Sequence, residues 1–181
     1  MKAFYLALLQ HFEDHKQDFI DAQLKPIKTI DFYAGQDQDP ENFNNLFFPA
    51  LFFSWNINYD NNPEKPTAVL EFRLVYENLR DTSNLSLNKE KALAFFDTAC
   101  LVDALLKELN IKEMGALHLV SEGLEVEPTV TDVYLLNYEA LYYANEKTRI
   151  RELQEGNIND VILNSHLKAK TNKVNRFQDL L

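Results

Sequence analysis

The sequence predicts an α+β fold: a mostly antiparallel sheet of about four to five strands packed against two helices. Residues 67–79 alternate with a period of two, which is the pattern of a half-exposed antiparallel strand. Residues 2–22 and 89–109 instead repeat apolar residues every three or four positions, as helices with one apolar face do. Runs of strands separated by helices indicate helices on one face of a sheet, and not a doubly wound α/β fold.

The N-terminal part is expected to hold one helix and one short strand. The predicted helical face over residues 2–22 consists of Phe4, Leu8, Phe12, His15 and Phe19. Pro26 ends this pattern. A strand is expected over 27–33, and the polar residues 34–45 predict an exposed loop.

The segment LFFPALFFSW, residues 46–55, is too short to cross a bilayer, which takes about 20 apolar residues. Pro49 cannot donate a ladder hydrogen bond, so it belongs at the start of a strand or on an edge strand. We expect a strand over 50–59 at an edge of the sheet. The start of this strand is apolar on both faces, so one face should lie between sheet and helix and the other against something else.

The rest of the chain is expected to add the alternating strand, a long helix and two further strands. Ser86 or Asn88 is the expected N-cap of the helix over 89–109. Its apolar band comprises Ala92, Phe95, Phe96, Ala99, Val102, Leu105, Leu106 and Leu109. The last two strands are expected over 116–121 and 130–143, and residues 144–181 are expected to form a short helix at 146–155 and then an arm.

Charge is distributed unevenly along the chain. Residues 1–145 hold 11 Lys and Arg against 23 Asp and Glu, whereas residues 146–181 hold 7 against 5. The acidic part argues against nonspecific nucleic-acid binding, which depends on cations contacting phosphate. The N-terminus does not resemble a signal peptide, since an acidic stretch follows its short apolar segment.

The residues that could carry catalysis are few. The four glycines are scattered singly, so no phosphate-binding loop is predicted. Cys100 lies in an apolar helical pattern and is interpreted as a buried, inert thiol. The acidic residues of 121–132 favour a solvated loop over a catalytic pair; they are Glu122, Glu125, Glu127 and Asp132.

The sequence HFEDH offers two histidines, His11 and His15, one helical turn apart on one face. The position after His11 is Phe12, so the zincin pattern does not match, and the sequence supplies no third ligand. Two incidental histidines are therefore favoured over a metal site. The sequence predicts no catalytic residues, no cofactor and no metal, and hence a protein that is not an enzyme.

Aromatic residues make up 12% of the chain, and some fall on both faces of their strands. Either a subunit interface covers the surplus, which is the favoured interpretation, or the N-terminal helix or the tail covers it within the monomer.

The order of elements and one short motif resemble the tail-terminator (tail-completion) proteins of tailed phages, in the version common in phages and prophages of Bacteroidetes. The motif is an F-P-x-A/C-L-like segment, here Phe48, Pro49, Ala50 and Leu51. It is followed by the strand AVLEFRLVYEN, the helix KALAFFDTACLVDALLKEL and strands ending in TDVYLLNYEALYY. The resemblance covers residues 1–143, taken as a tail-terminator-like domain, while 144–181 is a C-terminal extension without a counterpart.

The resemblance implies a virion protein, assembled in the bacterial cytoplasm, that forms a ring of about six copies. Such a ring caps the tail tube, joins it to the head-side connector or stopper protein, and lets DNA pass without specific binding. It implies no catalytic residues, no cofactor and no membrane. The expected subunit interface comprises Phe48, Phe52, Phe53, Trp55, Arg73, Tyr142 and Tyr143. The expected partner-contact arm carries Lys168, Lys170, Lys173 and Arg176.

Three alternatives remain at this point. The chain could be another head–tail neck protein or an adaptor of a contractile injection particle. It could be a non-viral soluble binding module, which should have a concave pocket. It could also be a metal-dependent enzyme that uses His11 and His15.

Overall fold

The computed structural model describes residues 1–39, 43, 46–59, 66–76, 82–87, 89–125 and 131–143. Contacts divide the chain into Met1–Tyr143 and Ala144–Leu181, and the described residues all belong to the first unit. The predicted helix at 146–155 and the arm residues Lys168, Lys170, Lys173 and Arg176 lie outside the described residues.

The observed elements follow the predicted α+β order. They are α1 (Lys2–Asp14), α2 (Lys16–Asp21), β1 (Thr29–Phe32), β2 (Ala50–Asn58), β3 (Thr67–Tyr76), α3 (Lys89–Glu108), β4 (His118–Leu124) and β5 (Asp132–Leu141). The α+β class is confirmed. The single helix expected over 2–22 is divided at His15, whose φ of −97° and ψ of 14° interrupt the helical geometry.

The strands form one five-stranded sheet in the order β1-β2-β3-β5-β4. β1 pairs parallel to β2, and the other three pairings are antiparallel. Pro49 directly precedes β2, as expected, and its carbonyl accepts a 2.8 Å hydrogen bond from the amide of Lys28. The predicted edge position is wrong for the first half of β2, because β1 pairs with Ala50–Phe53 on the side away from β3. Beyond Phe53, the described strand pairing of β2 is with β3 alone, so this half does lie at the edge.

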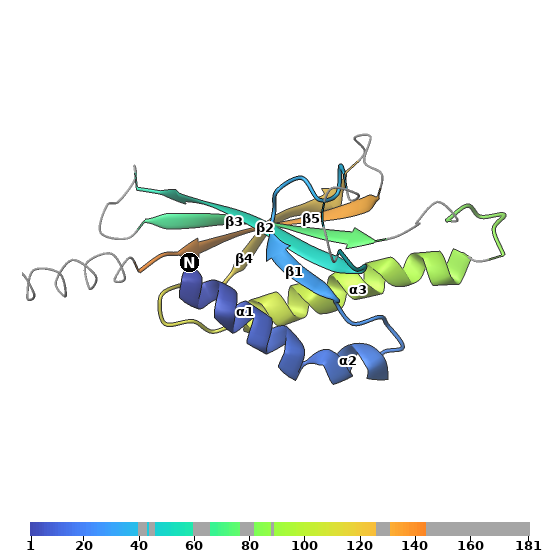
Figure 1. The fold of residues 1–181 in the computed structure, drawn as a ribbon, viewed down its shortest axis with the longest axis horizontal. Coiled ribbons are helices and arrows are strands. Elements are labelled where there is room, and N and C mark those ends of the chain that lie inside the picture. Colours follow the sequence, from blue (N-terminus) through green and yellow to red (C-terminus); the bar gives the residue numbers. More distant parts are fainter. Residues whose placement is uncertain are drawn as a thin grey trace, which may run out of the picture. The chain divides into compact units, whose positions relative to one another are not determined.

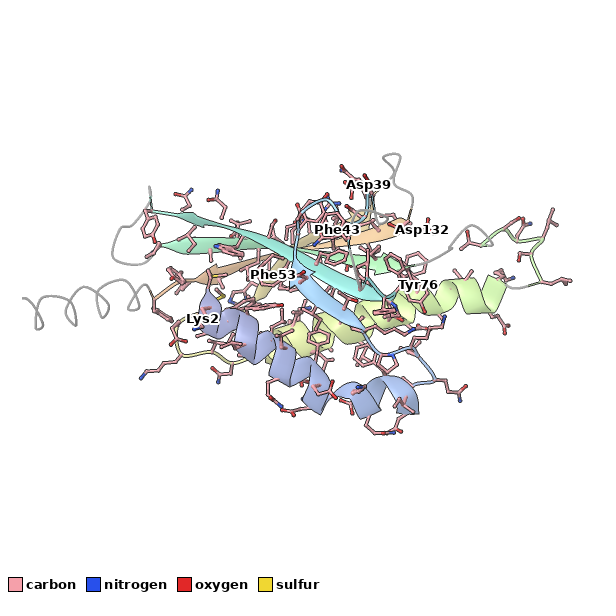
Figure 2. The ribbon with its side chains drawn as sticks, in the orientation of Figure 1. Lys2, Asp39, Phe43, Phe53, Tyr76 and Asp132 are labelled. Carbon is pink, nitrogen blue, oxygen red and sulfur yellow. The ribbon has the colours of Figure 1, made fainter. Side chains whose placement is uncertain are left out.

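α1 and α3 cover one face of the sheet (Figure 1). Phe53 of β2 lies between the sheet and α1, and its ring centroid is 5.6 Å from that of Phe4 and 5.5 Å from that of Phe72 (Figure 2). Phe95 of α3 contacts the ring of Tyr76 at 5.4 Å and that of Tyr134 at 5.8 Å. Alternate residues of each strand therefore build the main core, as the period of two predicted.

The predicted apolar band of α3 faces the sheet, and all its members except Phe96 are buried. The interpretation of Cys100 as a buried thiol is wrong, because its side chain is exposed. Each residue turns the helix by about 100°, so Cys100 is rotated away from buried Ala99 and its side chain is exposed at the margin of the apolar band.

Candidate functional site

The chain itself covers one end of the outer sheet face, opposite the helices. Asp39 and Phe43, from the loop between β1 and β2, lie on this side (Figure 2). A second buried cluster forms here from Ala50, Phe52, Val75 and Val133, packed against Tyr33, Leu46, Phe48 and Leu135. The outward-facing Phe52 thus meets the chain's own loop, in the place where a neighbouring subunit was expected.

Arg73 of β3 is the polar centre of this covered end. Its Nη1 donates a 2.8 Å hydrogen bond to Oδ2 of Asp37, a fully buried carboxylate. Its guanidinium also donates to both carboxylate oxygens of Glu125, and the Nη2–Oε1 distance is 3.1 Å. The Nε of Arg73 donates to Oε1 of Glu71, also at 3.1 Å. Three carboxylates therefore share one guanidinium at the covered end of the outer sheet face.

The ring of Tyr33 completes this Arg73 cluster, with Cζ of Arg73 lying 4.3 Å from the ring centroid. Burial alone would lower the pKa of Arg73, but the surrounding negative groups, Asp37 foremost, outweigh burial and raise it. Burial, aided by the neighbouring Asp37, also raises the pKa of Tyr33. The guanidinium stays charged at any ordinary pH and acts as a structural cation that holds the loop on the sheet.

Two predictions of exposed polar loops are wrong at this end of the sheet. Gln36 and Asp37, in the loop expected over 34–45, are buried, and Glu125 is the second case. A solvated acidic loop was expected, yet the Glu125 side chain is only 17% exposed and pairs with Arg73. The strand pairing explains this, because Glu125 follows β4 directly and its amide donates to the carbonyl of Val133 in β5. The carboxylate is thereby brought to the covered end of the outer face.

The loop is fixed by hydrogen bonds of its own. Nε2 of Gln36 donates to the carbonyl of Phe32 at 2.7 Å, and Oε1 of Gln36 accepts from the amide of Ala34 at 2.6 Å. The Thr131 hydroxyl donates to the carbonyl of Asp37 at 3.2 Å. Gly35 lies at the turn where this loop begins. Its φ of 87° is a left-handed conformation that suits glycine.

A different surface lies along the β1 edge of the sheet. Tyr5, Phe32 and Trp55 form what we call the edge aromatic patch. The ring centroids of Tyr5 and Phe32 are 4.6 Å apart, and those of Phe32 and Trp55 are 5.2 Å apart. Phe32 is 38% exposed and Trp55 39%. Exposed aromatic rings gathered at one place are typical of protein contact surfaces.

The structure separates the predicted interface residues into two groups. Phe52, Phe53 and Tyr142 are buried within the chain, Arg73 lies in its ion cluster, and Phe48 is half-buried under the loop. Trp55 and Tyr143 are exposed. Sequence reasoning did not include Tyr5 or Phe32 in an interface, and no local pattern marks them. The parallel pairing of β1 with β2 brings Phe32 beside Trp55, and the packing of α1 places Tyr5 against Phe32.

Within the part of the chain that the structure describes, His11, His15 and Glu108 are the group placed to hold a metal ion. One ligand atom of each lies within 4.8 Å of the others. The sequence offered the two histidines, and the tertiary structure adds the carboxylate from α3.

Among the described helices, none combines the length and the apolar composition needed to span a bilayer. No protein-family model matches the chain, and no curated protein matches it.

Proposed function

We propose that this chain is a tail terminator of a tailed phage, a structural virion protein. About six copies close into a ring that caps the tail tube and joins it to the head-side connector. The order of elements that carries the family resemblance is the order of the fold: an N-terminal helical region, strands, a long helix and two last strands. The proposed role needs surfaces for contact and no catalytic residue or cofactor.

The edge aromatic patch is the single observation that carries this proposal. An exposed tryptophan and phenylalanine at the rim of a sheet cost solubility in a monomer and become favourable when a partner buries them. Trp55 and Phe32 are exposed at this rim, so they replace the buried Phe52 and Phe53 as the expected contact residues. Tyr143 remains a predicted contact at the end of the sheet.

Charge supports the passage of DNA through such a ring. The chain carries a formal charge of −10, and a lumen lined by acidic groups repels phosphate and discourages DNA from adhering. The DNA therefore passes without specific binding. The basic residues Lys168, Lys170, Lys173 and Arg176 remain the proposed contact with an acidic neighbouring protein of the neck.

Another neck or injection-particle adaptor would share these surfaces and would be distinguished by its gene neighbourhood. A binding module would need a ligand pocket. The cavity between α1 and β1 measures ≈ 230 Å³, and its lining includes Leu9, Lys16 and Ile30. Ligand sites usually enclose about 300–1,000 Å³, so this particular cavity is small for a drug-sized ligand.

The test is the absolute mass of the purified protein by light scattering, with negative-stain images of the same fraction, alone and with the tail tube protein of the same phage. We expect rings of about six copies. Trp55→Ala and Phe32→Ala should reduce ring formation, while Leu141→Ala, an exposed apolar residue on β5, should not. A protein that stays monomeric in both conditions overturns the proposal.

A further inference from the structure

Two histidines and a carboxylate meet where α1 and α3 both end. His11 and His15 lie one helical turn apart, and their ring centroids are 4.5 Å apart. Glu108 is the last residue of α3. One ligand atom from each residue lies within 4.8 Å of the other two. Both histidines are half-buried and Glu108 is exposed.

The contact of His11 determines which of its nitrogens is free. Nε2 lies 2.9 Å from the carbonyl oxygen of Leu105. A carbonyl can only accept, so Nε2 carries the proton and Nδ1 of the neutral ring keeps its lone pair. Leu105 lies in the last turn of α3, where carbonyls have no donor within the helix. His11 therefore caps α3 and still has a ligand nitrogen.

His15 is oriented in the same way by a carboxylate. Its Nδ1 lies 2.7 Å from Oδ2 of Asp18, which also only accepts. Nδ1 thus carries the proton and the lone pair of the neutral ring is on Nε2. Metal-binding histidines characteristically have this arrangement, in which the second nitrogen donates to a carboxylate or a backbone carbonyl. Here both histidines have such an outer partner.

We propose that His11, His15 and Glu108 bind a divalent transition-metal ion of the zinc class. Two imidazoles and one carboxylate are ligands that zinc accepts readily. Tetrahedral zinc at about 2.05 Å from its ligands needs them about 3.4 Å apart. The separations of up to 4.8 Å must therefore contract, and the exposed side chain of Glu108 at a helix end can move to do so.

The Glu108 carboxylate is available for this role, since within the described residues it makes no hydrogen bond or ion pair. The bound ion joins the last turn of α1 to the last turn of α3. Three protein ligands leave a fourth position for water or for a ligand from another molecule. Because the unfolded chain lacks the assembled site, zinc at about 100 times its dissociation constant raises the folding equilibrium constant about 100-fold.

The test uses full-length protein without a histidine tag. Zinc affinity is measured by calorimetry and by competition with a chelating dye, and cobalt substitution reports the coordination geometry through visible absorption. We expect one ion per chain. His15→Gln and Glu108→Gln should each weaken zinc binding by more than about 100-fold, since loss of an outer partner alone costs about 10- to 100-fold. His11→Gln should do the same, and it also removes the contact with the carbonyl of Leu105 that caps α3.

The matched control is His118→Gln, which removes an exposed histidine of β4 outside the cluster. Its zinc affinity should equal that of the unaltered protein. Asp18→Ala keeps all three ligands and should weaken binding about 10- to 100-fold through the orientation of His15. Circular dichroism confirms that each variant is folded. Absence of stoichiometric binding, or equal losses in the cluster variants and in His118→Gln, overturns the proposal.

Discussion

Arg73 on β3 donates a 2.8 Å hydrogen bond from Nη1 to Oδ2 of Asp37, which lies 36 residues earlier in the loop between β1 and β2. The Asp37 side chain is fully buried and that of Arg73 is 10% exposed. This ion pair fastens the loop over the outer sheet face, where Phe52 needs cover. The cover leaves the edge aromatic patch as the surface proposed for assembly.

Removing Arg73 should strongly destabilise the fold. Arg73→Met leaves the buried Asp37 carboxylate without its cation, and breaking a buried pair in this way typically costs about 3–5 kcal/mol. Urea denaturation followed by circular dichroism measures the loss. Adding Asp37→Asn to Arg73→Met should recover part of it, because the uncompensated charge is then gone.

The control for Arg73 is Lys107→Met, which breaks the exposed pair of Lys107 with Asp103. It should change the free energy of unfolding by less than about 1 kcal/mol. Equal effects of Lys107→Met and Arg73→Met would show that the Arg73 cluster does not hold the loop.

Alkaline pH should destabilise the protein through Tyr138. Its hydroxyl donates a 2.7 Å hydrogen bond to Oδ1 of Asp103 in α3. Burial foremost, and then the hydrogen bond and charge of Asp103, raise the pKa of Tyr138 well above its usual 10. Above about pH 10 the unfolded chain loses this proton while the folded chain keeps it, so stability falls by about 1.4 kcal/mol per pH unit.

The measurement is the free energy of unfolding between pH 8 and about pH 11. Tyr138→Phe removes one titrating group, so its stability should fall less steeply above about pH 10 than that of the unaltered protein. Both proteins retain the other tyrosines with raised pKa values, so the comparison isolates Tyr138. These are Tyr5, Tyr33, Tyr76 and Tyr134. Parallel curves would contradict a proton retained by Tyr138 in the folded state.

Phe53 and Trp55 should separate stability from assembly. Phe53→Ala opens a cavity among Phe4, Phe72 and the sheet, and such truncations cost about 3–5 kcal/mol. Trp55→Ala removes a ring that is 39% exposed, so it should cost clearly less. Thermal unfolding compares the two variants. If Trp55→Ala lowered the thermal stability more than Phe53→Ala does, Trp55 would belong to the core and not to a contact surface.

Cys100 should react with a thiol reagent in the native protein. Its side chain is exposed on α3, so a chromogenic disulfide reagent should modify it without denaturant, to completion and in one phase. The rate at which the reagent modifies Cys100 is compared in buffer and in urea. Modification only after unfolding would restore the interpretation of a buried thiol.

The α+β class, the alternation of β3 and the position of Pro49 before β2 were all predicted from the sequence. These features are local, because the period of a strand or helix and the missing amide of proline act within a few residues. The prediction for Cys100 was wrong, although the local sequence already held the relevant information. Cys100 directly follows the buried Ala99, and this position turns its side chain toward solvent.

Only the tertiary structure decided which distant segments meet. The parallel pairing of β1 with β2 covered the first half of β2 and brought Phe32 beside Trp55, and the packing of α1 added Tyr5. The folding of the loop placed Asp37 on Arg73, and the packing of the helices brought Glu108 to the two histidines. These contacts join residues dozens of positions apart. Chain periodicity holds no information on such pairings, which depend on how buried faces of separate elements fit together.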